Sequence, residues 1–193
     1  MKIILASASP RRRELLTQIG LEFQVVVSNV EEKVTATAPA AVVEELSAQK
    51  AEGVLEMLRE QAQEEQDSLV IGSDTIVAVD GQILGKPKDA EDAKRMLRML
   101  QGRAHEVYTG VTVLRVGTEE RRTFHEETKV IFFSMTEEDI ETYVATNDPL
   151  DKAGAYGIQG FCARYIQGIE GDYNNVVGLP VGRLYQEIKD WIS

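Results

Sequence analysis

The stretch KIILASASPRRRELL, residues 2–16, joins a short apolar run to the start of a helix. Residues 2–6 are apolar after the lysine and are followed by a serine, which predicts a buried β-strand. Ser9 belongs to the residue types that cap helices, and Pro10 favours the first helical position. The helix is predicted to run to about Ile19, because a glycine follows it. The chain therefore opens with a strand, a short polar turn and a helix.

Further along the chain, strand and helix patterns first alternate, and long strands then follow one another. Strands are predicted at residues 23–28, 68–73, 75–79, 82–84, 107–116, 123–133 and 161–167, with Asp80-Gly81 as a hairpin turn. Helices are predicted from Pro39 onward and over residues 89–100, 136–145 and 180–191. This order favours an α/β protein with a mixed β-sheet.

Composition places the chain among ordinary globular proteins. It has 193 residues, of which 43% are hydrophobic and 27% are charged. These values predict one domain over residues 1–193, with a smaller lobe at about 85–145 as an alternative.

Cys162 is the only cysteine, so a disulfide framework and a cysteine zinc site are excluded, and we expect a buried apolar side chain. We assign His105 and His125 to structural roles.

The sequence also limits which binding partners and which cellular location are expected for the protein. A net charge of −11 repels polyanions, so no nucleic-acid partner is expected. No run of 18 apolar residues occurs, so no membrane-spanning helix and no membrane partner are expected. Residues 2–8 imitate an export signal, but their apolar stretch is too short for one. We therefore expect a cytoplasmic protein, and the sequence leaves open whether it is a monomer or a homodimer.

The first predicted helix begins with an unfavourable charge pattern. Arg11, Arg12 and Arg13 lie in its first turn, where the helix dipole is already positive. Local conflicts of this kind are expected at functional sites. The amides of the helix start and the hydroxyls of Ser7 and Ser9 would complete a phosphate cradle. The alternative is a solvated basic patch that pairs with surface carboxylates.

A second set of charged residues supplies the other ingredients of phosphate chemistry. Asp74 ends a predicted strand, and open α/β sheets bind ligands beyond the carboxyl ends of their strands. Its carboxylate could hold a metal or activate water, or it could simply cap a turn. Glu31-Glu32, Lys50 and Lys86 are weak signals one by one. Taken together, carboxylates can hold Mg²⁺ and cations can neutralise phosphate oxygens.

Residues 151–160, DKAGAYGIQG, contain three glycines within ten positions. Glycines let the backbone approach a ligand closely. Gln159 carries both a donor and an acceptor and could read the edge of a base, while Tyr156 could stack or simply pack. The alternative is a tight turn between a helix and a strand.

These segments, in this order and spacing, resemble the Maf family of nucleoside triphosphate pyrophosphatases. The resemblance spans nearly the whole chain and rests on several distinctive blocks: LASASPRRRELL (5–16), Glu31-Glu32, Lys50, GSDTIV (72–77), GKP (85–87), DKAGAYGIQG (151–160) and VVGLP (176–180). It implies an elongated mixed β-sheet flanked by helices, the inosine triphosphatase-like (Maf/Ham1) fold. It also implies hydrolysis of a nucleoside triphosphate to the monophosphate and pyrophosphate with a divalent cation, Mg²⁺ or Mn²⁺.

The resemblance also implies roles for individual residues. Asp74 would be the proton acceptor, Glu32, Lys50 and Lys86 would act with it on the phosphates, and Asp74 and Glu32 would hold the metal. Ser7, Ser9, Arg11 and Arg12 would bind phosphate. The family branch that acts on dTTP and UTP carries the residues found here at three specificity positions, Arg11, Thr75 and Gln159.

The family resemblance implies two readings of function. The first is an enzyme that hydrolyses dTTP, UTP and modified pyrimidine nucleotides and so clears the nucleotide pool. The second is a nucleotide-binding regulator of septum formation and cell division that does not turn its ligand over. The intact set of carboxylates favours the enzyme.

Overall fold

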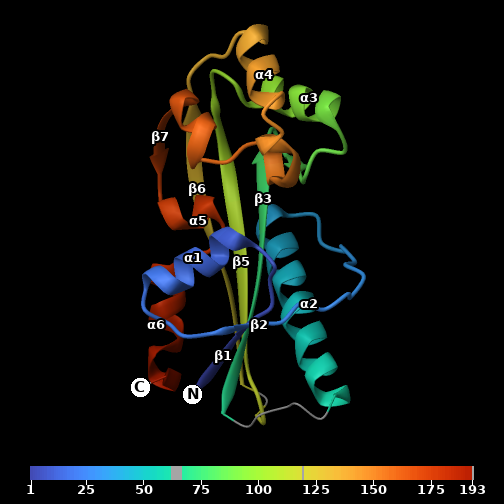
Figure 1. Ribbon diagram of the computed structural model, residues 1–193, viewed down its shortest axis with the longest axis vertical. Helices are drawn as coiled ribbons and strands as arrows, with labels where there is room; N and C mark the ends of the chain where they lie inside the picture. Colours follow the sequence, from blue (N-terminus) through green and yellow to red (C-terminus); the bar gives the residue numbers. More distant parts are fainter. Residues whose placement is uncertain (62–66, 119, 193) are drawn as a thin grey trace. The chain divides into compact units, whose positions relative to one another are not determined.

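The computed structural model describes residues 1–61, 67–118 and 120–192 (Figure 1). The chain divides into two compact units. The first comprises Met1–Asp74, Thr109–Glu126 and Gly178–Ser193, and the second comprises Thr75–Tyr108 and Glu127–Val177. Three long strands cross the unit boundaries: β3 (Ser68–Val79), β5 (Ala104–Arg115) and β6 (Arg121–Phe132).

The described strands form one mixed sheet in the order β2-β1-β3-β5-β6-β7, with β4 paired to β3. In the first unit, β1 (Lys2–Leu5) runs parallel to both β2 (Gln24–Val25) and β3, and Leu5 lies opposite Ile71. In the second unit, β7 (Ile166–Glu170) runs antiparallel to β6. The predicted α/β class with a mixed sheet flanked by helices is therefore confirmed.

Three helices belong to the first unit: α1 (Pro10–Gln18), α2 (Pro39–Glu60) and α6 (Val181–Ile192). Pro10 opens α1 as predicted, and Gly20 adopts a φ of 75° just after its end. The helix α2 buries an apolar stripe at helical spacing: Val42, Val43, Leu46, Val54 and Leu58. It runs beside β3, because Gly72 of β3 has no side chain and admits the backbone of α2 (Figure 1).

The second unit contains α3 (Ala90–Leu100), α4 (Glu137–Val144) and α5 (Tyr173–Val177). Asp89 caps α3 by accepting a hydrogen bond from the Asp92 amide at 2.8 Å, and Thr136 with Asp139 forms the predicted capping box of α4. The two helices pack against each other over a core that includes Leu97, Phe132 and Tyr143. The hairpin between β3 and β4 (Gln82–Leu84) turns at Asp80 and Gly81, both at positive φ, as predicted.

The structure corrects two predicted elements and adds one that was not predicted. Asp74 does not end a strand, because β3 continues unbroken from Ser68 to Val79. The predicted strand at 161–167 is mostly a 3₁₀ helix, Gly160–Tyr165, and β7 begins at Ile166. The short helix α5 has no counterpart among the predicted elements. Among the described residues, no helix combines the length and apolar character that crossing a membrane requires.

Candidate active site

The start of α1 is organised around Ser7 and Arg12. The Ser7 hydroxyl oxygen accepts hydrogen bonds from the Ser9 amide at 3.3 Å and from Nη1 of Arg12 at 3.1 Å. Ser9 occupies the N-cap position, but its side chain caps no amide of α1 in the described structure. The predicted cap is therefore correct in position and wrong in its hydrogen bond. Ser7, eight per cent exposed, is the hydroxyl that orders this turn.

The Arg12 side chain is also hydrogen-bonded to the backbone of Gly178. Its Nε donates to the Gly178 carbonyl oxygen at 2.8 Å, and the Ser73 hydroxyl donates to the same oxygen at 3.3 Å. Burial lowers the pKa of the Arg12 guanidinium, and the nearby charge of Arg11 lowers it further, whereas the negative charges of Asp74 and Glu32 act in the opposite direction. The side chain is thus a partly desolvated cation held in one orientation.

Lys50 brings two predicted carboxylates together. Its ammonium contacts Oδ1 of Asp74 and lies 3.3 Å from Oε1 of Glu32. The Asp74 side chain is 15% exposed and that of Lys50 is 23% exposed, whereas the Glu32 side chain, on an irregular segment, is 48% exposed. The two carboxylates and the ammonium group therefore lie close enough together to act on one small ligand: the ammonium on an anion, and the carboxylates on a cation that accompanies it.

The same two carboxylates pass a test for a hard divalent cation. Mg²⁺ is usually bound by one or two protein carboxylates together with substrate phosphates, rather than by an all-protein cage. Across the described parts of the chain, no group of three or more His, Cys, Asp or Glu side chains is assembled as a metal site. Asp74 and Glu32, which share one ammonium, therefore fit a cation that the substrate helps to hold.

The other arginines of the predicted cradle differ from Arg12. Arg11 is half-buried, and its charge acts on Arg12. Arg13 is exposed, and its Nη2 donates to the Ala8 carbonyl oxygen at 3.4 Å. The first unit therefore assembles the predicted residues Ser7, Arg11, Arg12, Glu32, Lys50 and Asp74, with Ser9 at the helix start.

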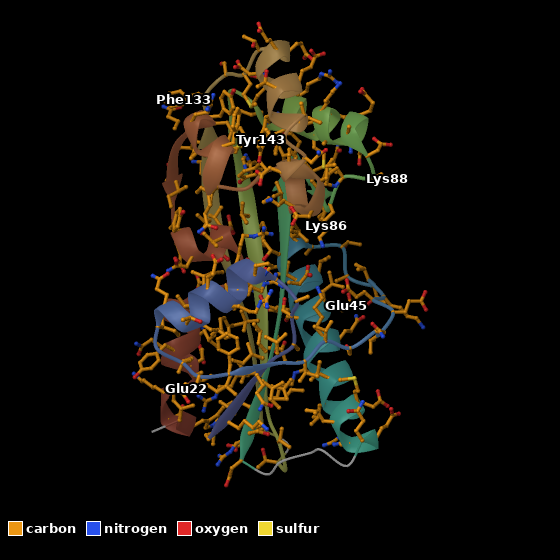
Figure 2. All side chains as sticks on the ribbon, viewed as in Figure 1. Glu22, Glu45, Lys86, Lys88, Phe133 and Tyr143 are labelled. Atoms are coloured by element: carbon orange, nitrogen blue, oxygen red, sulfur yellow. The ribbon has the colours of Figure 1, made fainter. Side chains whose placement is uncertain are left out.

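Three predicted residues lie in the second unit: Thr75, Lys86 and Gln159. Thr75 is half-buried in β3. Lys86, labelled in Figure 2, and Gln159 are both exposed. The Gly85 carbonyl oxygen accepts a hydrogen bond from the Gly154 amide at 3.0 Å, so the segments that carry Lys86 and Gln159 are linked through their backbones.

The glycine-rich residues 151–160 are packed closely within the second unit. A Cβ atom on Gly154 would lie 2.7 Å from a methyl group of Val77, and the Tyr156 hydroxyl lies 2.7 Å from Nε2 of the buried His105. Tyr156 is therefore buried and packs against His105 in the second unit. Cys162 is fully buried, as predicted, and burial raises the pKa of its thiol to about 12.

Two residues of the first unit were not found from the sequence as parts of the site. Gly178 contributes a carbonyl oxygen, which no side-chain pattern reveals, although it stands inside the VVGLP block. Gly72 lets β3 approach the α2 backbone beside Lys50; it opens the GSDTIV block, but no pattern in the sequence indicates that packing role.

Comparison with known proteins gives one family. The family model described as Maf-like protein matches residues 2–191. The chain is 57% identical to a dTTP/UTP pyrophosphatase of Agathobacter rectalis over 197 aligned positions, covering 97% of this chain and 96% of that protein. It is 52% identical to one of Bacillus cytotoxicus, covering 100% and 96%, and 48% identical to one of Carboxydothermus hydrogenoformans, covering 99% of each.

A solved structure supports the fold as well. The Ham1 protein of Staphylococcus aureus superposes with a TM-score of 0.50 at 17% sequence identity, covering 86% of this chain and 80% of that one. At this identity the likeness concerns the fold alone, and it agrees with the expected Maf/Ham1 architecture. Because the family model covers nearly the whole sequence and the relatives match along their full lengths, the chain belongs to the Maf family.

Proposed function

We propose that the protein hydrolyses nucleoside triphosphates, dTTP and UTP above all, to the monophosphate and pyrophosphate. The observation that carries the proposal is the contact of Lys50 with both Asp74 and Glu32 in the unit where Arg12 is held at the start of α1. Anhydride hydrolysis needs a base for water and cations for the phosphate oxygens. Relatives about half identical in sequence carry the name dTTP/UTP pyrophosphatase, which supports the same substrates here.

The residues of the first unit divide the work. We assign to Asp74 the task of orienting and deprotonating the attacking water, because its carboxylate is the more buried of the two and is held by Lys50. Arg12 and Lys50 would offset negative charge on the triphosphate, and Ser7 would fix the guanidinium of Arg12. Water attacks the α-phosphorus, the anhydride oxygen leaves with pyrophosphate, and the water proton goes to Asp74.

A divalent cation, Mg²⁺ or Mn²⁺, would be held by Asp74 and Glu32 with the help of the substrate. When bound, it would supply charge neutralisation for the phosphate oxygens. The roles of Lys86 in phosphate binding, and of Arg11, Thr75 and Gln159 in selecting pyrimidine bases, remain predictions from the family resemblance. The cytoplasmic location and the absence of a nucleic-acid partner are likewise predictions from the sequence.

A substrate panel tests the proposal directly. The protein is incubated with dTTP, UTP, GTP and 7-methyl-GTP in the presence of Mg²⁺ or Mn²⁺, and the products are separated by chromatography. We expect monophosphate and pyrophosphate, formed fastest from dTTP and UTP. Release of orthophosphate would overturn the mechanism. Tight nucleotide binding without any product would favour the regulatory role instead.

A further inference from the structure

The segment of residues 28–36, which carries Glu32, has no regular secondary structure, and its residues are largely exposed. It follows β2 and leads toward α2. An exposed ion pair contributes little to ordering a chain, so the contact between Glu32 and Lys50 is too weak to hold this segment by itself. Other contacts must fix the position of the Glu32 carboxylate.

Glu45 of α2, labelled in Figure 2, fixes the end of the segment. Its carboxylate accepts hydrogen bonds from the Thr35 amide at 2.9 Å, the Thr35 hydroxyl at 2.6 Å and the Ala36 amide at 3.0 Å. These bonds lower the pKa of Glu45, with the Thr35 hydroxyl as the largest cause. Hydrogen bonds to a charged acceptor are stronger than neutral ones, so this is a firm anchor.

Gln49 fixes the residue that follows Glu32. Its Oε1 accepts from the Lys33 amide at 2.9 Å, and its Nε2 donates to the Lys33 carbonyl oxygen at 2.6 Å. The side-chain amide of Gln49 thus pairs with both the N–H and the C=O group of Lys33, as the backbone of a neighbouring strand would. Either an apolar or an acidic side chain at this position would lose at least one of the two bonds.

Gly53 allows the start of the segment to lie close to α2. A Cβ atom there would come within 2.8 Å of the Ser28 hydroxyl oxygen and would overlap the Val30 side chain. Residues 45, 49 and 53 follow one another at intervals of four and so share one face of the helix. That face bonds to the segment at Glu45 and Gln49 and lets it approach closely at Gly53, and Lys50 directly follows Gln49 in the helix.

We propose that Glu45 and Gln49 are positioning residues for Glu32. By holding residues 33–36 on α2, they keep the Glu32 carboxylate beside Lys50 and Asp74, where it serves the cation and the triphosphate. Neither residue touches the substrate in this scheme. The inference rests on the proposed function and adds two residues to it that the family resemblance did not supply.

A double-mutant cycle separates positioning from general stability. Glu45→Met and Gln49→Met, which remove the hydrogen-bonding groups, are each combined with Glu32→Gln, and kcat, KM and the Mg²⁺ concentration for half-maximal rate are measured with dTTP. In the wild-type background each change is expected to lower kcat/KM by about 10–100-fold and to raise the Mg²⁺ requirement, the usual effect of losing a support for a metal-binding carboxylate. In the Glu32→Gln background the further loss is expected to be less than about threefold, because coupled residues are not additive.

Amide hydrogen exchange provides a readout that does not depend on activity. We expect the amides of Lys33, Thr35 and Ala36 to exchange faster in the two variants, with little change in melting temperature. Glu56→Met, the same substitution at an exposed carboxylate further along α2, is the matched control and is expected to leave rate and exchange unchanged.

The possible failures are distinct. A wild-type protein that releases no pyrophosphate rejects the proposed function. If the wild-type protein is active, but Glu45→Met and Gln49→Met lower kcat/KM by the same factor with and without Glu32→Gln, the positioning role alone is overturned. Unchanged exchange of the three amides would overturn it as well.

Discussion

The backbone of Gly72 in β3 lies so close to Ser47 in α2 that a Cβ atom at position 72 would overlap the Ser47 carbonyl oxygen and lie 2.8 Å from the Ala51 amide nitrogen. Ser47 lies three residues before Lys50 in the helix and Ala51 one residue after it, and Asp74 follows Gly72 by two residues in the strand. The missing side chain therefore sets the distance between the strand that carries Asp74 and the helix that carries Lys50.

Gly72→Ala is expected to destabilise the protein by about 1–3 kcal/mol, because the added methyl group forces α2 away from β3. It should also lower pyrophosphatase activity by separating Lys50 from Asp74. Urea denaturation and the rate with dTTP measure the two effects. Gly182→Ala in α6 is the control: nothing lies within 4 Å of the new Cβ, and stability should hold or rise slightly. Equal stability of both variants would contradict the close approach.

Asp74→Asn should keep the fold and lose turnover by about 10²–10⁴-fold, the usual contribution of a general base. The amide preserves size and can still accept a hydrogen bond from Lys50, but it lacks the charge and basicity of the carboxylate. Steady-state rates with dTTP, together with a thermal melt, test this. Asp67→Asn makes the same change at an exposed carboxylate of the first unit that pairs with Arg115 and should leave the rate unaffected. A variant that retains a third or more of the wild-type rate would exclude Asp74 as the base.

Arg12 and Arg13 should respond differently to an anion. Burial penalises the charge of Arg12, and a phosphate group beside it would offset that penalty, whereas Arg13 is exposed. Pyrophosphate should therefore raise the melting temperature of the wild type and of Arg13→Gln, but much less that of Arg12→Gln. For Arg11→Gln we expect weaker nucleotide binding with an unchanged or raised melting temperature, because one cation fewer stands at the positive end of α1. Equal shifts in all four proteins would argue against a phosphate cradle.

Local signals predicted the elements that local chemistry determines. The capping box of Thr136 and Asp139 and the positive-φ turn at Asp80 are examples. The sequence failed where pairing or packing decides. Asp74 and Thr75 interrupt an apolar run and look like a strand end, yet β3 continues because the ladder is built from backbone groups and its far end pairs with β4. Residues 161–167 look strand-like, but Cys162 and Tyr165 are buried three positions apart, the period of a 3₁₀ helix.

Charged side chains in the sequence indicated part of the candidate site. The backbone groups that contribute to it left no signal in the sequence. The arginines after Ser9 were singled out because their charge conflicts with the helix dipole, and Asp74 because the pattern placed it at the end of a strand, whereas Glu32 and Lys50 were weak signals that only the family resemblance assigned to the site. The carbonyl oxygen of Gly178 leaves no such trace, because any residue has one. Glu45 and Gln49 look like ordinary surface residues of a helix, and their partners are backbone groups of another segment.

The lowered pKa of His105 predicts how the free energy of unfolding depends on pH. Burial, and to a lesser extent the charge of Arg103, lowers the pKa of this histidine to about 4 from 6.5. The unfolded chain therefore binds a proton between these values that the folded protein does not, so stability falls as pH drops from about 6.5 to 4, by at most about 1.4 kcal/mol per pH unit. Urea midpoints at pH 7 and pH 5 should differ less in His105→Gln than in the wild type. His125→Gln, at the other histidine, is the control; an equally reduced pH dependence there would show that His105 is not the cause.

The choice of base should depend on Gln159. Thymine and uracil present two carbonyl oxygens and an N3–H donor, and a side-chain amide, with a donor and an acceptor, can pair with that edge. Glutamate only accepts when ionised and would face the carbonyl oxygens. Gln159→Glu should therefore lower kcat/KM for dTTP and UTP by the equivalent of about 0.5–1.5 kcal/mol, the usual net contribution of one hydrogen bond, and lower it less for GTP and 7-methyl-GTP. Gln167→Glu, the same change at an exposed residue of β7, should alter none of the four values. Equal losses with all four nucleotides would mean that Gln159 supports the loop or the triphosphate, and no loss at all would leave Arg11 and Thr75 as the residues that select the base.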